Sequence, residues 1–212
     1  GKKLLPDSFT DENRIDSIQG IYVPFWLFDA DADASLSFRA TQVSCWSDSN
    51  YDYTRTSYYQ VLRAGKIAFD RVPVDGSKKM DDTYMEAIEP YNYADLEDFG
   101  TPYLAGYLAD RYDVDADAST PRANERIKNS TAAAFRATVH GYASCTPTGS
   151  NINLSNRNIR YALLPVWLLN TKYRDEMYTF AMNGQTGKFI GKLPVDRSKY
   201  WKYWGIVFGI AA

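Results

Sequence analysis

One short pattern, Pro-x-Trp-Leu inside an apolar run, occurs twice in this sequence. Each copy is followed, in the same order, by a Gly-Lys pair and by a Pro-Val-Asp-x-Ser-Lys segment. Two independent matches in one order predict an internal duplication. The repeated positions are Pro24, Trp26, Pro73 and Asp75 in the first copy and Pro165, Trp167, Pro194 and Asp196 in the second.

Each repeated unit is predicted to be a strand followed by a hairpin and a helix. The Pro-x-Trp-Leu runs are rich in strand-forming residues, and their prolines belong at a strand start, bulge or edge. The second copy predicts strands at 177–182 and 188–193 around a 183–187 turn, whereas the first predicts longer strands at 30–43 and 51–62. We expect Trp26 and Trp167 to be buried against helices at equivalent places. We expect Asp75 and Asp196 near helix starts, where backbone N–H groups are free.

Helices are predicted after the first copy and between the copies. The first runs from 77 to 89 and stops at Pro90. Thr101-Pro102 and Thr120-Pro121 have the composition of helix starts. The second helix has Ile127, Thr131, Ala134, Phe135 and Val139 on one side, and a strand pair at 141–146 and 151–154 follows. The predicted fold class is therefore α+β, with internally duplicated antiparallel strand and hairpin units and a central helical insertion. Its expected parts are a first unit at 1–90, a helical connection at 91–150 and a second unit at 151–212.

Composition indicates a globular chain. Of the 212 residues 45% are hydrophobic and 15% aromatic, and disordered chains are poor in aromatic residues. The net charge of −2 argues against a general nucleic-acid-binding surface. Acidic residues dominate 81–117 and basic residues dominate 187–203, which is typical of solvated faces.

Few residues offer recognisable chemistry. Cys45 and Cys145 are interpreted as buried thiols, with a single disulfide as the alternative. With one histidine, His140, the segment lacks the ligands for a four-coordinate zinc site, and we expect His140 to serve at a helix C-terminus rather than in catalysis. We therefore predict no catalytic, cofactor-binding or metal-binding residues here. Catalysis by paired carboxylates stays open, because spatial pairing is invisible in a sequence.

Two runs of alternate aspartates resemble the start of a calcium loop. They begin at Asp29 and at Asp113, but both lack the glycine and the glutamate that an EF-hand requires at positions six and twelve. In a strand, alternate residues share one face, so we expect the first run to face solvent. The second is predicted to lie at a helix end and in a loop.

The two ends of the sequence carry further signals. The opening Gly1-Lys2-Lys3 resembles a cut end rather than a native start, so we expect a segment of a longer protein. Near the other end, basic residues and tryptophans precede the uncharged run 205–212, which is the order expected at a membrane interface. This run is far shorter than the roughly 20 residues of a span, so a truncated span and an ordinary terminal helix both remain open.

Several stretches together resemble the bacterial TFIIB-type zinc-ribbon-containing proteins, some of which are labelled primosomal helicase-like. The similar stretches are 20–27, 72–82, 106–110, 121–126, 178–188 and 193–196. The resemblance covers nearly the whole chain. It implies zinc-binding ribbons before this segment and a transmembrane stretch after it. No phosphate loop or other helicase motif occurs in these residues.

The leading hypothesis is a non-enzymatic binding or scaffold domain of a membrane-anchored zinc-ribbon protein. It would lie at the cytoplasmic face, because the basic residues before the apolar tail follow the positive-inside bias, and it would bind a protein partner. One alternative is a nucleic-acid-associated accessory protein of replication or transcription. The other is a carboxylate-based hydrolase. The residues considered for nucleic-acid contact are Arg122, Arg126, Lys128 and Arg136.

Overall fold

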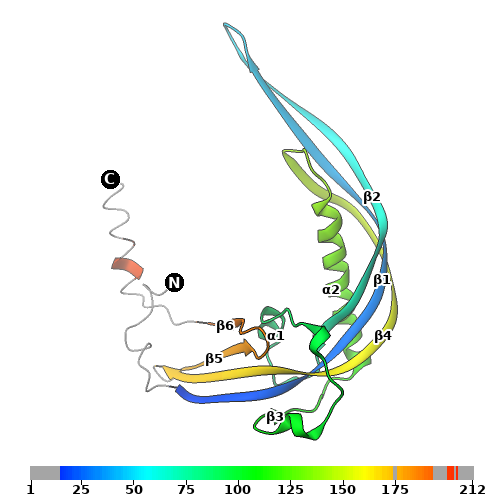
Figure 1. Ribbon diagram of the computed structural model, residues 1–212. Coiled ribbons are helices and arrows are strands. Elements are labelled where there is room, and N and C mark those ends of the chain that lie inside the picture. Colours follow the sequence, from blue (N-terminus) through cyan, green and yellow to red (C-terminus); the bar gives the residue numbers. More distant parts are fainter. Residues whose placement is uncertain (1–14, 174–175, 193–199, 203, 205–212) are drawn as a thin grey trace. The chain divides into compact units, whose positions relative to one another are not determined.

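The chain forms a strand-rich α+β fold (Figure 1). The computed structural model describes residues 15–173, 176–192, 200–202 and 204. Within them, antiparallel pairing joins β1 (Ile15–Ser47) to β2 (Asp52–Asp75), β4 (Ser144–Tyr173) to β5 (Glu176–Asn183), and β5 to β6 (Phe189–Gly191). The strand order is β2-β1-β4-β5-β6, and the short β3 (Leu108–Ala109) pairs in parallel with β1.

The chain divides into two compact units, each assembled from separated segments. The hairpin unit consists of Phe25–Gly76 and Val114–Ala162. The β5–β6 unit consists of the described residues within Gly1–Pro24, Ser77–Asp113 and Leu163–Ala212. Strands β1 and β4 therefore contribute residues to both units. This division differs from the consecutive stretches 1–90, 91–150 and 151–212.

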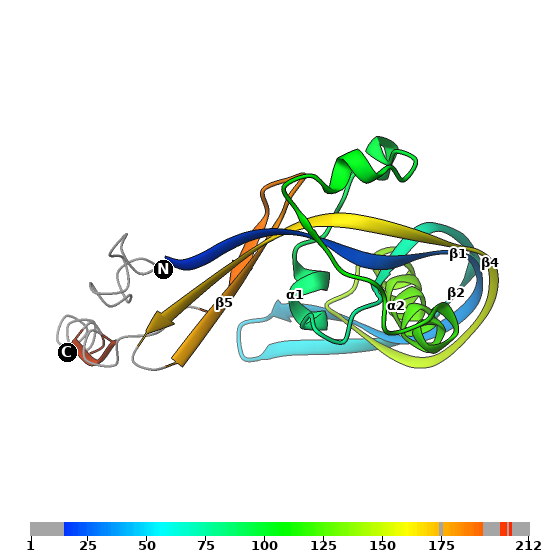
Figure 2. The same cartoon turned by 90° about the horizontal axis from the view of Figure 1, so that it is seen from below.

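Helix α2 (Ala116–Ala137) covers one face of β1 and β2 in the hairpin unit (Figure 2). The even-numbered residues of β1 point to this face, which we call the helix face, and the odd-numbered residues point to the opposite face. Three alanines at positions 30, 32 and 34 let the helix approach closely, and Ile127 packs on the first two. Further along, Phe135 packs against Leu36 and Phe38.

Helix α2 begins four residues before the predicted Thr120. The carboxylate of Asp115 caps it by accepting from the N–H of Ala118, so Pro121 lies inside the helix. Its buried side includes the predicted Ile127, Thr131 and Phe135, whereas the predicted Ala134 is exposed.

The other predicted helices are shorter than expected. Only α1 (Asp82–Ala87) forms within 77–89, because the carboxylate of Asp81 accepts from the N–H of Thr83 and starts the helix there. After Gly100 the chain makes one 3-10 turn at Thr101–Leu104, and a second such turn spans Tyr93–Asp95. The strand pair predicted at 141–146 and 151–154 was wrong, since 144–146 and 151–154 both lie in the uninterrupted strand β4.

A buried asparagine organises the β5–β6 unit. Asn183 is fully buried, and its side-chain amide donates to the carbonyls of Ile88 and Pro90. Its side-chain oxygen accepts from the N–H groups of Gln185 and Thr186. This one side chain thus accepts from backbone N–H groups of the β5–β6 turn and holds the segment after α1 against the turn. The predicted hairpin of 177–193 is confirmed here by the pairing of β5 with β6.

The structure does not confirm the predicted duplication. Trp26 pairs with Val74 on β2, directly beside the first Pro-Val-Asp segment, whereas Trp167 pairs with Met182 on β5. The second segment, with Pro194 and Asp196, lies outside the described residues. Similar motifs therefore occur in different strand pairings.

The two tryptophans are half-buried rather than buried. The ring N–H of Trp26 donates to the carbonyl of Val114 at 2.9 Å, and its ring contacts Tyr161. Trp167 contacts Tyr107, which also packs on Tyr22. Each ring is covered by another aromatic residue, although Trp26 also packs on the cluster that contains Ala123 of α2.

The three motif prolines that the structure describes occupy the expected kinds of position. Pro24 lies between the β1 residues that pair with β3 and those that pair with β2. Pro165 precedes the first β4 residue that pairs with β5, and Pro73 lies on the edge strand β2. Their missing N–H groups therefore fall at edges or at gaps in the ladders.

Replacement of Ile127 by alanine tests the packing of α2. We expect Ile127→Ala to lower the free energy of unfolding by about 2–5 kcal/mol, because this α2 side chain is fully buried against Ala30 and Ala32 of β1. Urea denaturation followed by tryptophan fluorescence measures the change. The exposed Tyr58→Ala on the same hairpin should change the unfolding free energy by less than about 0.5 kcal/mol. Equal effects of the two substitutions would contradict this packing.

Candidate functional site

A β-bulge interrupts the ladder between β1 and β2. The register shifts between Phe28, which pairs with Val72, and Ala30, which pairs with Phe69. Asp29 therefore faces two β2 residues, Asp70 and Arg71. The backbone of Arg71 has φ 56°, the left-handed conformation that a residue in such a bulge can adopt.

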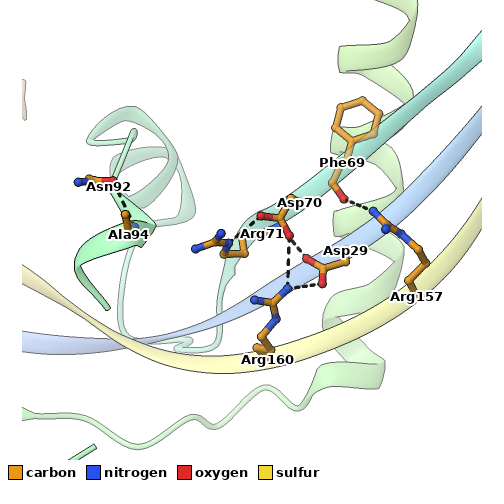
Figure 3. Close-up of polar contacts among 8 residues, drawn as sticks. All are labelled: Asp29, Phe69, Asp70, Arg71, Asn92, Ala94, Arg157 and Arg160. Carbon is orange, nitrogen blue, oxygen red and sulfur yellow. Dashed lines mark hydrogen bonds and ion pairs between the residues drawn. The ribbon is translucent and has the colours of Figure 1, made fainter. Parts of the chain in front are cut away.

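Charged side chains fill this bulge (Figure 3). The backbone N–H of Arg71 donates to the carboxylate of Asp29 at 2.9 Å, and its side chain donates to Asp70 at 2.8 Å. Arg160 on β4 donates to both carboxylates, with 3.3 Å between its Nη2 and the Asp70 oxygen. Asp29 is only 6% exposed. The expectation that this residue faces solvent was wrong.

The pKa of Asp29 lies below its ordinary value. Burial raises the pKa of this carboxyl, but hydrogen bonds from the N–H of Arg71 and from Arg160, with smaller contributions from Asp70 and from the Arg160 charge, lower it by more. Asp29 is therefore ionised at neutral pH. A carboxyl that acts as a general acid needs a raised pKa. The bulge is therefore suited to holding β1, β2 and β4 together rather than to proton transfer.

The aspartates that follow Asp29 on β1 are also paired with cations. The carboxylate of Asp31 lies 3.3 Å from Nε of Arg157, and the guanidinium of Arg157 also donates to the carbonyl of Phe69. Asp33 lies 3.5 Å from Lys66, with both side chains largely exposed. The alternate aspartates thus form a row of ion pairs across three strands.

The four basic residues considered for nucleic-acid contact lie on α2, but three of them make internal contacts. Arg122 forms an ion pair with the buried Asp75 at 3.0 Å, and Arg126 donates to the carbonyl of Pro73. Arg136 donates to the carbonyl of Cys145, while Lys128 is exposed. The first two contacts fasten α2 to the end of β2.

The position of Asp75 corrects its expected role. It does end a strand, as predicted, but its carboxylate binds Arg122 of α2 instead of capping the next helix, whose cap is Asp81. Burial of an ionised carboxylate without a charged partner costs more free energy than the absence of a second acid at a helix start. The equivalent prediction for Asp196 lies outside the described residues.

Sequence reasoning missed an exposed aromatic surface at the end of the β1–β2 hairpin, in residues 42–59, which we call the arm. Strand β4 begins at Ser144, whose hydroxyl is 2.5 Å from that of Thr41, so the hairpin continues beyond the start of β4 as two strands (Figure 1). The arm carries several exposed aromatic side chains. They are Trp46, Tyr51, Tyr53, Tyr58 and Tyr59.

Most of these aromatic residues lie on the helix face. Trp46 pairs with Tyr53 across the strands, and their rings stack with centroids 5.5 Å apart. The guanidinium of Arg55 lies 6.0 Å from the centre of the Trp46 ring, a cation–π distance. Tyr59 contacts Tyr142, which itself packs on the core under α2. The aromatic row therefore continues the apolar core past the end of the helix.

The turn at the tip of the arm is fixed by one carboxylate. Asp48 accepts from the N–H groups of Asn50 and Tyr51 at 2.8 Å each and from the hydroxyl of Tyr53 at 2.9 Å. These three hydrogen bonds lower the pKa of Asp48. The composition of the arm could have revealed it, since residues 42–59 contain four tyrosines and four serines but no lysine or glutamate.

The structure also locates the two cysteines and the histidine that the sequence analysis considered. Cys45 and Cys145 are free, and Cys45 is exposed, so the expectation of two buried thiols was wrong. His140 is exposed shortly after the end of α2.

Within residues 15–173, 176–192, 200–202 and 204, no group of three or more His, Cys, Asp or Glu residues is placed to hold a metal ion. Across the same residues, no helix has both the length and the apolar character to cross a bilayer.

The chain is similar to a Bacillus subtilis (strain 168) protein named Uncharacterized protein YdjG. The two are 39% identical over 196 residues, which is 92% of this chain and 58% of the relative. The chain thus spans a little over half the length of that protein. No family model matches the chain, and no solved structure matches it.

Substitution of Asp29 tests the charged bulge. Because its folded-state pKa is lowered, the ionised carboxylate contributes stability above its unfolded pKa of about 3.9, and this is lost as the pH falls through the folded value. We expect Asp29→Asn to lower the unfolding free energy at pH 7 by about 1–3 kcal/mol, and the difference from the wild type to shrink as the pH falls below about 4, where the carboxyl of the unfolded chain becomes protonated. Denaturation across pH 3–7 measures it. The exposed Asp33→Asn should have little effect, and a difference independent of pH would contradict the assignment.

Proposed function

We propose that this chain is a non-enzymatic binding or scaffold module whose arm receives a partner protein. The observation that carries the proposal is the aromatic row on the helix face. Under α2 this face is a buried core, whereas beyond the helix it continues as exposed rings, with Trp46 50% exposed. Large apolar surface that continues a core without cover is characteristic of an interaction site.

The composition of the arm supports a protein as the partner. Tyrosine, tryptophan and arginine are enriched in the buried centres of protein interfaces, whereas lysine and glutamate are depleted. Tyrosine and serine together are also the main residues of antibody paratopes, where rigid rings supply area and hydroxyls supply adaptable hydrogen bonds. The arm has this composition over residues 42–59.

The arm is ordered before a partner arrives. The bonds of Asp48 fix the turn, and the ring stack of Trp46 and Tyr53 leaves their side chains little rotational freedom. Association therefore has less side-chain entropy to lose. Arg55, held over the Trp46 ring, adds a positive charge beside an apolar surface. We infer a partner that presents an apolar side chain to the row and a carboxylate to Arg55.

The other two functions gain less support. A hydrolase would use the paired carboxylates of Asp29 and Asp70, but the lowered pKa of Asp29 and the contacts with Arg160 favour a structural ion pair. Nucleic-acid binding through α2 would use arginines that already bind Asp75 and Pro73. Single-stranded nucleic acid could still stack on the arm, so it is one outcome of the test below.

Photocrosslinking tests the arm directly. We replace Trp46 by p-benzoylphenylalanine in the full-length protein, irradiate the cells that express it, and identify the adducts by mass spectrometry. We expect discrete protein adducts from position 46. The control carries p-benzoylphenylalanine in place of Tyr58. The Tyr58 side chain is more exposed, at 71%, but lies on the opposite face of the strands. Position 58 should not give the same adducts.

The identified partner is then purified, and its affinity is measured by calorimetry. Trp46→Ala should weaken binding by about 30-fold, which corresponds to a hot-spot loss of about 2 kcal/mol. Tyr58→Ala should leave the affinity unchanged. Adducts with nucleic acid alone, identical adducts from both faces, or an affinity insensitive to Trp46→Ala would each overturn the proposal.

We further propose that the full-length protein carries zinc ribbons and a membrane anchor, with this module at the cytoplasmic face. The resemblance of the sequence motifs to those of zinc-ribbon-containing proteins supports this context. So do the exposed Tyr200, Trp201 and Trp204 beside the basic residues of the tail, because such rings favour the membrane interface. The zinc would be bound outside this segment.

Fractionation tests the anchor. The full-length protein should sediment with the membranes, and high salt should not release it, because an apolar span is held by the hydrophobic effect rather than by charge. A version that ends at residue 192 should stay in the supernatant. Full-length protein found wholly in the supernatant would refute the anchor.

A further inference from the structure

Strand β4 covers the outer side of β1 only as far as Thr41. There the N–H of Ala143 donates to the carbonyl of Thr41, and β4 begins at the next residue, Ser144. Strand β1 continues through residues 42–47, which pair with β2 on their other side (Figure 1). Among the described residues, no strand continues the line of β4 along this stretch. We call residues 42–47 the open edge.

The backbone groups of the open edge alternate in direction. In an antiparallel ladder, consecutive residues direct their N–H and C=O groups to opposite sides of the strand. The N–H of Asp48 donates to the carbonyl of Tyr51 within the hairpin, whereas the carbonyl of Thr41 faces β4. Even-numbered residues of β1 therefore bond to β2 here, and odd-numbered residues direct both groups outwards. In the open edge the outward-directed residues are Val43, Cys45 and Ser47.

The open edge lacks the residues that normally protect the free edge of a sheet. Natural edge strands carry charged side chains or proline, which discourage the addition of another chain. Residues 42–47 contain neither a charged residue nor proline. The other edge of the arm, on β2, carries Asp52 and Arg55, and Arg63 follows them along the same strand. Charge therefore protects the arm on the β2 side and not on the β1 side.

We propose that the partner protein of the arm adds an extended segment to the open edge, in line with β4. This inference rests on the proposed function and says how the partner is held. The backbone of the added segment exchanges hydrogen bonds with Val43, Cys45 and Ser47. In such strand addition the main-chain hydrogen bonds provide affinity, and the contacts of alternate side chains provide specificity.

The side chains of the open edge indicate the chemistry of the added segment. On the helix face Trp46 is exposed, and Ser44, two residues before it on the same face, is small. On the opposite face Val43 is exposed. Aromatic and β-branched residues are favourable cross-strand neighbours of such side chains. The added segment therefore has aromatic or β-branched residues at its centre. The carboxylate that faces Arg55 comes from another part of the partner, because Arg55 lies on β2, one strand further away.

Amide hydrogen exchange tests where the backbone of the partner binds. Exchange is measured at single-residue resolution in the full-length protein, with and without the partner identified by photocrosslinking. We expect the amides of Val43, Cys45 and Ser47 to exchange more slowly in the complex, because new hydrogen bonds protect them. The controls are the amides of Thr54 and Thr56, which pair with Cys45 and Val43 and so direct their N–H groups to the other edge. Their exchange should be the same in both samples.

One pair of substitutions tests the same pairing by affinity. Cys45→Pro removes an outward-directed N–H without removing a bond to β2, whereas Cys45→Ser keeps that N–H. We expect Cys45→Pro to raise the dissociation constant of the purified partner by about 10-fold, the effect of one lost hydrogen bond, and Cys45→Ser to leave it unchanged in calorimetry. Circular dichroism and the unfolding midpoint verify that both variants are folded. If proline unfolds the arm, the exchange experiment decides, because it needs no variant.

Two results would overturn strand addition and leave the proposed function standing. The first is a partner that binds without slowing exchange at positions 43, 45 and 47, and the second is an affinity that a folded Cys45→Pro variant retains. Loss of all protein adducts from position 46 would instead overturn the proposed function and this inference with it. Slow exchange of the same three amides in the concentrated protein alone would show a second copy at the open edge, and it would also overturn the inference.

Discussion

The alternation of side chains along β1 is the constraint on which the hairpin unit depends. From Phe28 to Ala40 apolar and polar residues alternate without a break, so one face of the strand is apolar over a long distance. Alanines at the start of this stretch leave room for Ile127 of α2, and the larger Leu36 and Phe38 meet Phe135 near the end of the helix. The helix, the core and the aromatic row of the arm all lie on the face that this alternation creates.

The opposite face begins with the charged bulge. An extra residue in β2 turns the backbone N–H of Arg71 towards Asp29, and Arg160 approaches the same carboxylate from β4. Three strands thus meet at one buried charge. A one-residue slip of either neighbour would leave that charge without its hydrogen bonds, at a cost of several kcal/mol. The bulge therefore fixes the register near the base of the hairpin, far along the strands from the arm.

Local sequence signals predicted the parts of the fold that depend on local contacts. The β5–β6 turn, the long hairpin and the buried stripe of α2 follow from turn residues and periodicity, and all three are present. The duplication was inferred from motifs, but strand pairing is not encoded within six residues, and Trp26 and Trp167 have unlike partners. Basic residues on α2 resembled a binding face because the buried Asp75 that binds Arg122 is 47 residues away in sequence. The arm was overlooked because tyrosine-rich strands are usually core, and only the end of α2 and the start of β4 expose it.

The lysine-free composition of the arm has a consequence for regulation and for detection. Acetylation, ubiquitination and amine-reactive labels all act on the ε-amino group of lysine, and the first lysine after the arm is Lys66. Cells that modify lysines on the rest of the surface would leave the charge of the arm unchanged. Tyrosine, serine and threonine are the side chains there that kinases could modify, and a phosphate on Tyr53 would face the carboxylate of Asp48 and repel it. A change of that kind would loosen the turn that holds the arm in shape.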